Sequence, residues 1–217
     1  PTTVTLSINR RLALAEVAKR YRLSIIEDDA YGALASQGIA TFSQILPSHT
    51  WYLQGLSKSF APGMRMAWVY GPSESETHQL CQVMGALKVS DNPLTHQIVS
   101  KWVRSGVAQR TAEETLKTAR VRVKLFRRLF PDDRYQISDD GFHVWFSLGK
   151  KNAYEIAFLL QQAGISATPS NEFSFEKFDE SFLRISLSGY SSLAALEIAL
   201  KKFRDVLNTL YLKQTQV

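Results

Sequence analysis

The sequence holds a single cysteine, Cys81, which excludes an internal disulfide framework and is expected to be a small buried hydrophobic side chain. No apolar run approaches the ~18 residues that cross a bilayer, and the polar start lacks the apolar stretch of a signal peptide. The histidines are scattered without metal-ligand spacing, at His49, His78, His96 and His143. We therefore expect a cytoplasmic protein with no metal site and no membrane segment.

Several functional motifs are also missing. The sequence has no Gly-rich phosphate loop of the Walker or dinucleotide type and no Gly-x-Ser-x-Gly elbow. Nothing resembles a helix-turn-helix, a zinc finger or an RNA-binding signature. The net charge of +6 and the pI of about 9.4 permit a polyanionic partner without requiring one. The densest basic stretch, residues 120–128, is most simply a solvated helix face.

The 217 residues, 45% of them hydrophobic, suffice for one large domain or two small ones. Apolar periodicity and capping residues predict helices over residues 8–22, 74–87, 94–106, 109–130, 151–163 and 191–211. Strands are predicted over residues 23–28, 51–54, 66–70, 135–138, 142–148 and 182–187. The first half thus predicts an α/β arrangement, with a buried strand at 23–28, and the second half a compact α+β domain. We place the division between residues 1–106 and 107–217.

Lys58 is the first candidate for chemistry. It lies in a turn of small residues after the apolar run that begins at Trp51. A lysine that forms a Schiff base must be neutral, which requires burial or a cationic neighbour. The alternative is an ordinary surface lysine.

A carboxylate and a phenol follow the earlier strand. Asp28 ends the apolar stretch at 23–28, and a carboxylate there is costly unless it is paired. In a strand it faces away from Glu27 and Asp29. A protonated pyridine nitrogen is one partner for Asp28, and a helix cap or an arginine is the alternative. Tyr31 could donate to a ring oxygen or could simply be a boundary tyrosine.

Two arginines and two serines complete the set. Arg65, seven positions after Lys58, could clamp a phosphate or form a surface ion pair. The hydroxyls of Ser57 and Ser59 could bind phosphate or only shape the turn. Arg184 lies inside an otherwise apolar strand and needs an anion, which could be a substrate carboxylate or a structural partner. An amine, a carboxylate, a phenol and a guanidinium together suit pyridoxal phosphate.

These motifs resemble the fold-type I pyridoxal-phosphate family, in its class I aminotransferase branch, over essentially all of the chain. Asp28-Asp-Ala-Tyr31 resembles the family's Asp-x-x-Tyr element, and Ser57-Lys58 with Arg65 resembles its cofactor-lysine motif. The resemblance implies that Asp28 bonds the ring nitrogen and Tyr31 the ring hydroxyl. It also implies that Lys58 holds the cofactor covalently and that Arg65, beside Ser57, binds the phosphate.

The same resemblance extends to the second half and to the start of the chain. Arg184, in Leu-Arg-Ile-Ser, resembles the arginine that holds the substrate carboxylate. Pro1-Thr2-Thr3 resembles the tail of an Asn-Pro-Thr-Gly motif. The implied fold class is α/β, namely the C-terminal part of a fold-type I large domain followed by a small α+β C-terminal domain. A homodimer is typical of the family.

The chain also departs from the family pattern. Thr3 stands where glycine is usual, Gly55 where a phosphate-binding Ser or Thr is common, and Pro169-Ser170 where Pro-Gly is frequent. The motif's asparagine, the Gly-rich phosphate turn and the ring-stacking aromatic residue would all lie before residue 1. We therefore expect a piece of a longer protein with an incomplete cofactor site.

Asn9-Arg-Arg-Leu and Gly141-Phe-His-Val-Trp are similar to the aminotransferase-like domain of MocR-type regulators, which carry an N-terminal GntR-type winged helix. This likeness implies an effector-sensing domain that binds an amino acid and reaches DNA only through a winged helix absent from this chain. The alternative is a fragment of a stand-alone, 2-aminoadipate-type aminotransferase. A third possibility is a remnant with no activity. The N-terminal region of the parent protein discriminates between the first two.

Overall fold

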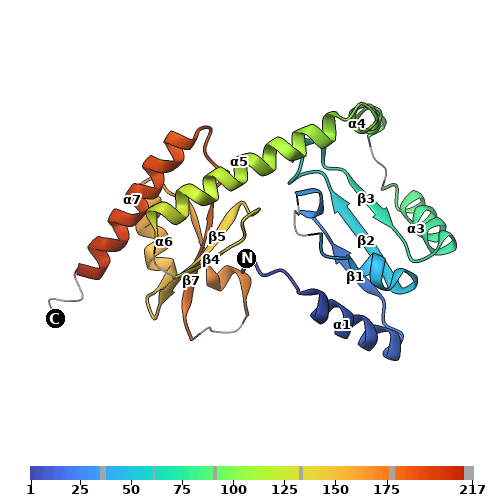
Figure 1. Ribbon diagram of the computed structural model, residues 1–217, viewed down its shortest axis with the longest axis horizontal. Helices are drawn as coiled ribbons and strands as arrows, with labels where there is room; N and C mark the ends of the chain where they lie inside the picture. The colour runs from blue at the N-terminus through green and yellow to red at the C-terminus, as the bar shows by residue number, and fades with distance from the viewer. Residues whose placement is uncertain (35–37, 61, 90–91, 132–133, 176–178, 213–217) are drawn as a thin grey trace. The chain divides into compact units, whose positions relative to one another are not determined.

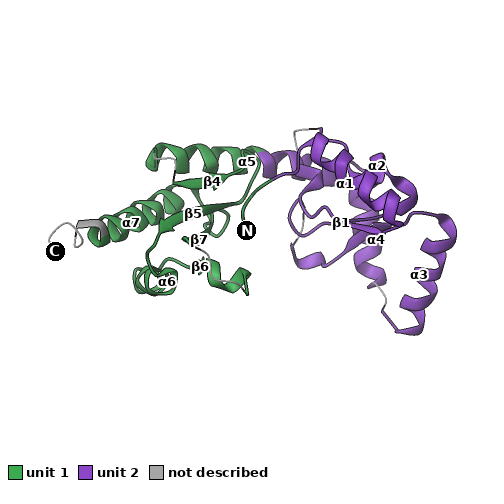
Figure 2. Ribbon diagram, turned by 90° about the horizontal axis from the view of Figure 1, so that it is seen from below, with its two compact units in different colours: residues 1–4, 117–217 green, residues 5–116 purple. Residues whose placement is uncertain are grey.

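The computed structural model describes residues 1–34, 38–60, 62–89, 92–131, 134–175 and 179–212. The chain divides into two compact units, shown in Figure 2. Unit 2 comprises residues 5–116, and unit 1 comprises residues 1–4 with residues 117–217. Their boundary falls inside helix α5 (Val107–Leu129), whereas the domain division expected at 106/107 stays a prediction.

Unit 2 contains one sheet with helices packed around it (Figure 1). Its elements before α5 are α1 (Ile8–Tyr21), β1 (Ile25–Asp28), η1 (Gly32–Leu34), α2 (Phe42–Ile45), η2 (Pro47–His49), β2 (Thr50–Gly55), η3 (Pro62–Met64), β3 (Ala67–Tyr70), α3 (Glu74–Ala86) and α4 (Pro93–Arg104). The strand order is β1-β2-β3, with β1 parallel and β3 antiparallel to β2.

The helices of unit 2 begin where their capping residues predict. The Ser7 hydroxyl accepts from the backbone N–H of Arg10 at the start of α1. Asn92 caps α4 in the same way, and Pro93 occupies its first turn, where a missing N–H has no consequence. The predicted helices and strands of both halves form, with bounds that differ by about two residues at most.

Two expectations about burial are wrong. Strand β1 is not fully buried, because its residues alternate between half-buried and exposed positions and the Ile26 side chain is 73% exposed. The reason is that the described residues cover one face of β1 more than the other. Cys81 is exposed, since it lies on α3, a helix without a buried residue. Sequence periodicity identifies an apolar face but does not say what covers it.

Unit 1 is built on a four-stranded antiparallel sheet of order β4-β5-β7-β6. Its elements after α5 are β4 (Tyr135–Ile137), β5 (His143–Gly149), α6 (Ala153–Gln162), β6 (Ala167–Pro169), η4 (Ser170–Phe173), β7 (Ser181–Ser186) and α7 (Leu193–Leu212). Strand β6 was not predicted, because it is short and its sequence, Ala-Thr-Pro, ends in a proline, which is unusual within a strand. Gly164 ends the α6 segment with a φ of 79°, as its position predicts.

One face of this sheet forms the largest buried cluster of the described chain. Inward residues of β5 and β7 pack against α5, α6 and α7 through Phe126, Phe130, Val144, Phe146, Leu160, Leu183, Ile185, Leu200 and Phe203. Because side chains alternate along a strand, the residues between them lie on the opposite face. Arg184, between Leu183 and Ile185, therefore lies on the face away from the helices.

Within the part of the chain that the structure describes, no helix combines the length and apolar character needed to cross a membrane. The same part contains no cluster of three or more His, Cys, Asp or Glu side chains arranged to hold a metal ion.

Candidate functional site

The candidate residues of unit 2 lie at one end of the β1-β2-β3 sheet. Strands β1 and β2 are parallel, with Asp28 opposite Leu53, so their carboxyl ends meet at the same edge. Strand β3 runs antiparallel from Ala67, which lies opposite Gly55. The segment after β1, the turn after β2 and the residues before β3 therefore leave from one end of the sheet (Figure 1).

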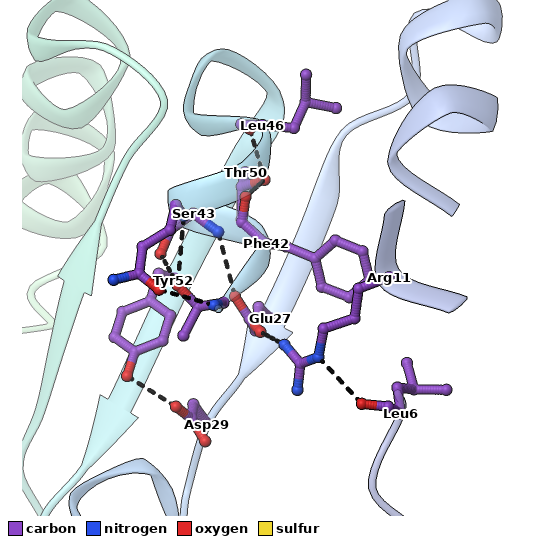
Figure 3. A network of polar contacts seen from close by, with 11 residues as sticks. Leu6, Arg11, Glu27, Asp29, Phe42, Ser43, Leu46, Thr50 and Tyr52 are labelled. Carbon is purple, nitrogen blue, oxygen red and sulfur yellow. Dashed lines mark hydrogen bonds and ion pairs between the residues drawn. The ribbon is translucent and has the colours of Figure 1, made fainter. Parts of the chain in front are cut away.

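Asp28 is set apart from its two acidic neighbours. Glu27 forms an ion pair with Arg11, with 2.6 Å between Nη1 and Oε1, and accepts from the backbone N–H of Ser43 at 3.3 Å (Figure 3). Asp29 accepts from the Tyr52 hydroxyl at 2.8 Å. The Asp28 side chain is exposed and has no hydrogen bond or ion pair to any described residue. Its carboxylate is thus available to a ligand.

The Asp29–Tyr52 contact ties the first residue after β1 to β2, as Figure 3 shows. Burial, and then the hydrogen bond to the Asp29 carboxylate, raise the pKa of the Tyr52 phenol well above its usual value. Sequence reasoning missed this pair. The register that places Glu27 opposite Tyr52 is the signal for it, and register is a property of the folded sheet.

Tyr31 lies in the turn that follows β1. The Gly32 backbone N–H donates to Asp29 and that of Leu34 donates to Tyr31, which gives a single 3₁₀ turn anchored by the buried Leu34 side chain. A Cβ at Gly32 would lie 2.1 Å from Asp29 Oδ2, so a larger residue here would force the Asp29 side chain to move. The Tyr31 ring is half-buried.

A small apolar cluster anchors the turn that carries Lys58. Leu56 and Met66 are buried with Val99 of α4, and the Leu56 backbone N–H donates to the Met66 carbonyl at 3.1 Å. Phe60 closes the turn by donating to Leu56 at 2.9 Å. The Lys58 side chain is exposed, so the described residues do not bury its amine.

The serines beside Lys58 differ in exposure. Ser57 is half-buried and Ser59 is only 2% exposed. Ser59 therefore contributes to the turn itself, and Ser57 is the better placed hydroxyl for a ligand. Gly55, where a hydroxyl residue is common in the family it resembles, has open space around its α-carbon.

Arg65 lies between η3 and β3 with an exposed guanidinium and a φ of 45°. A left-handed conformation is unfavourable for a residue with a side chain and often accompanies function. Thr3, where glycine is usual in the family, has a φ of 62° in unit 1 and is strained for the same reason.

Arg184 belongs to unit 1, whereas the other candidates belong to unit 2. It lies in β7 opposite Trp145 of β5 and Thr168 of β6. The residue is half-buried, and its guanidinium carbon lies 5.8 Å from the centre of the Phe173 ring. No acidic side chain among the described residues pairs with it.

The strand pairing places Asp28 and the segments that carry Tyr31, Ser57, Lys58 and Arg65 at one end of the same sheet. A free carboxylate, an exposed amine and an exposed guanidinium are the donor set that an aldehyde cofactor with a ring nitrogen and a phosphate requires. The residues present therefore fit pyridoxal phosphate, although Gly55 removes one phosphate ligand.

Residues 1–203 match the family described as aminotransferase class I and II. The chain belongs to this family. The match covers both units, which explains why motifs in each half resemble one family.

Two curated relatives represent two kinds of protein. The chain is 25% identical over 212 residues to the uncharacterized HTH-type transcriptional regulator YdeF of Bacillus subtilis. The aligned region covers 97% of this chain and 46% of YdeF. It is 24% identical over 206 residues to aromatic-amino-acid aminotransferase 1 of Thermococcus litoralis. That alignment covers 87% of this chain and 47% of the enzyme. The chain thus spans about half the length of the curated relatives it matches.

Solved structures share the fold. The α-aminoadipate aminotransferase LysN of Thermus thermophilus superimposes with a TM-score of 0.86 at 18% identity, over 97% of this chain and 57% of LysN. The predicted fold class is confirmed: the chain has the α/β fold of these aminotransferases and corresponds to part of it.

Proposed function

We propose that this chain is the C-terminal part of a pyridoxal-phosphate-dependent, aminotransferase-like domain that senses an amino-acid effector in a MocR/GntR-type transcriptional regulator. The convergence of Asp28, Lys58 and Arg65 at one end of a sheet supports the cofactor. The HTH-type regulators among the relatives support the regulatory role. LysN, whose structure contains N-(5'-phosphopyridoxyl)-L-leucine, supports the ligand chemistry.

Each candidate residue of unit 2 has a proposed role. Asp28 accepts from the protonated ring nitrogen, and Tyr31 donates to the ring oxygen. Ser57 and Arg65 hold the phosphate through a hydroxyl and a guanidinium fork. Lys58 attaches the cofactor and, once an amino acid displaces it, moves the proton of the α-carbon. When bound, the cofactor supplies an electron sink for that carbon.

Arg184 has the remaining task, which is to hold the carboxylate of the amino acid. In a regulator, binding alone suffices, because an effector that prefers one conformation shifts the domain toward it. In an enzyme, the proton transfer by Lys58 would continue to transamination.

Borohydride trapping tests the cofactor proposal. The full-length protein is incubated with pyridoxal phosphate and reduced, and its peptides are weighed. We expect a reduced phosphopyridoxyl group on Lys58, no label in Lys58→Arg, and normal labelling in the control Lys88→Arg, which changes an exposed lysine of the same unit. Undiminished labelling of Lys58→Arg, or none in the wild type, contradicts the proposal.

The second candidate function is a stand-alone aminotransferase, which the likeness to the Thermococcus litoralis enzyme favours. Sequencing the N-terminal region of the intact protein decides between the two. A winged helix of roughly 60–70 residues indicates the regulator. An N-terminus shortly before the large domain, together with turnover of an amino acid, indicates the enzyme.

The partners and the location follow from the same proposal. We propose a cytoplasmic homodimer that binds an amino acid, and DNA only through a winged helix outside these residues. The single cysteine is consistent with a reducing compartment.

A further inference from the structure

The outer face of the unit 1 sheet carries an aromatic group beside a cation. Trp145 of β5 stacks on Phe182 of β7, with ring centres 5.1 Å apart and planes inclined by 9°. Phe173 of η4 meets Trp145 edge to face at 5.8 Å. Arg184 lies over the Phe173 ring. We call Trp145, Phe173 and Phe182 the aromatic shelf.

The shelf supports Arg184 without neutralising its charge. A ring face attracts a guanidinium and leaves its N–H groups free to donate. Arg184 is half-buried, and no described acidic residue pairs with it, so a site for an anion remains.

The shelf also presents apolar surface next to that charge. Trp145 is almost fully buried, whereas Phe173 is 38% exposed and its ring centre lies 5.8 Å from the guanidinium carbon. A carboxylate on Arg184 would place a neighbouring aromatic group within reach of Phe173. An acid with only a short polar chain would leave that ring in water.

We infer that Phe173 is a positioning residue for Arg184 and an apolar contact for the ligand, so that this site selects carboxylates that carry an aromatic or large apolar group. The inference rests on the proposed role of Arg184 in holding the carboxylate of the effector or substrate. It adds the chemical class of that molecule, which is an amino acid with an aromatic or bulky apolar side chain.

Arginine labelling of the 217-residue chain tests this ligand preference in the absence of the cofactor. Phenylglyoxal modifies accessible arginines, and peptide mass spectrometry gives the rate at Arg184 with exposed Arg20 as the internal reference. The probes are 3-phenylpropanoate, propanoate and 3-phenylpropan-1-ol. We expect 3-phenylpropanoate to protect Arg184 at a concentration about threefold lower than propanoate does. The alcohol should not protect.

The variants separate positioning from folding. In Phe173→Leu the preference for the phenyl acid should disappear, while Phe173→Tyr should retain it. Phe158→Leu, which changes an exposed ring on α6, is the matched control and should behave as the wild type. Far-ultraviolet circular dichroism checks that each variant is folded.

The possible failures have different meanings. No protection of Arg184 by either acid overturns the inference and leaves the trapping experiment at Lys58 untouched. Equal protection by the two acids, or an unchanged preference in folded Phe173→Leu, also overturns it. If Lys58 fails to trap the cofactor while the phenyl acid still protects Arg184, only the proposed function is wrong.

Discussion

At the scale of single residues, Arg65 has both a strained backbone and a proposed role in binding the phosphate. Its left-handed φ of 45° costs roughly 1–2 kcal/mol for a residue with a side chain. The exposed guanidinium has no structural contact among the described residues that would offset this cost. We propose that phosphate binding accounts for this conformation of Arg65.

Arg65→Gly should therefore separate stability from binding. Glycine adopts this conformation freely, so we expect the free energy of unfolding to stay equal or to rise by up to about 1 kcal/mol. Pyridoxal-phosphate binding to the full-length protein, measured by absorbance titration, should weaken at least about tenfold because a charge-assisted fork is lost.

Arg22→Gly is the matched control. Arg22 also has a positive φ, 54°, at the C-terminal end of α1. Its replacement should raise stability in urea unfolding without changing cofactor binding. An Arg65→Gly variant that binds the cofactor as tightly as the wild type would contradict the phosphate role.

At the same scale, Tyr52 makes stability depend on pH in the alkaline range. The pKa of its phenol is raised in the fold, so the folded state holds the proton longer than the unfolded chain does. The resulting stabilisation is complete below the unfolded pKa of about 10 and is lost as the pH rises toward the higher folded value.

Urea unfolding between about pH 9 and about pH 11 measures this effect. The wild type should lose more stability over that range than Tyr52→Phe, which has no phenolic proton to release. Tyr52→Phe should also be less stable at neutral pH by about 1 kcal/mol, since Asp29 loses its donor. Parallel pH curves for the two proteins would exclude a contribution from Tyr52.

At the scale of elements, Arg11 connects α1 to β1 and α2. Its guanidinium pairs with Glu27 and lies 5.4 Å from the centre of the Phe42 ring (Figure 3). Glu27 also accepts the Ser43 backbone N–H at the start of α2. Both charged side chains are largely buried, so removing one leaves the other without its partner.

Arg11→Ala should destabilise unit 2 by about 2–4 kcal/mol. Arg128→Ala, which removes an exposed partner of Glu197 at 3.4 Å, is the control and should cost less than about 1 kcal/mol. Thermal unfolding of both variants measures the difference. Equal midpoints would show that the Arg11–Glu27 pair contributes no more than a surface contact.

The elements themselves were largely predictable, because caps and periodicity are local. Ser7 and Pro93 mark helix starts that the structure confirms. The exposure of β1 and of Cys81 was not predictable, since burial depends on which element covers a face. The Asp29–Tyr52 pair was missed for a related reason, as strand register is set by long-range packing.

The candidate site was predictable only in part. The positions of Asp28 and Lys58 at strand ends could be read from the sequence, because each follows an apolar run. Predicting that both residues lie at the same end of the sheet requires knowing that β1 pairs in parallel with β2. The contact of Arg184 with Phe173 could not be predicted, because Phe173 lies in a 3₁₀ turn that is too short to produce a recognisable sequence period.

At the scale of the whole molecule, unit 2 exposes apolar side chains on several elements. Ile26 on β1, Trp68 and Tyr70 on β3, and Tyr21 on α1 are exposed. In the described sheet both outer strands, β1 and β3, also have an unpaired edge. Apolar surface beside open strand edges favours association.

The 217-residue chain should therefore self-associate in solution. Light scattering at micromolar concentration should give a mass well above the 24.5 kDa of one chain. An Ile26→Lys variant, with a charge on the β1 edge strand, should associate less, whereas Val121→Lys in unit 1 is the control. A monodisperse monomer would contradict this expectation.

We propose that side chains from three separate segments surround one cofactor. A crystal structure of the full-length protein with pyridoxal phosphate tests it most directly. We expect a covalent bond from Lys58 Nζ to the cofactor, a hydrogen bond between Asp28 and the ring nitrogen, and contact of the phosphate with Arg65. A cofactor bound elsewhere, or attached to another lysine with Asp28 facing solvent, would contradict it.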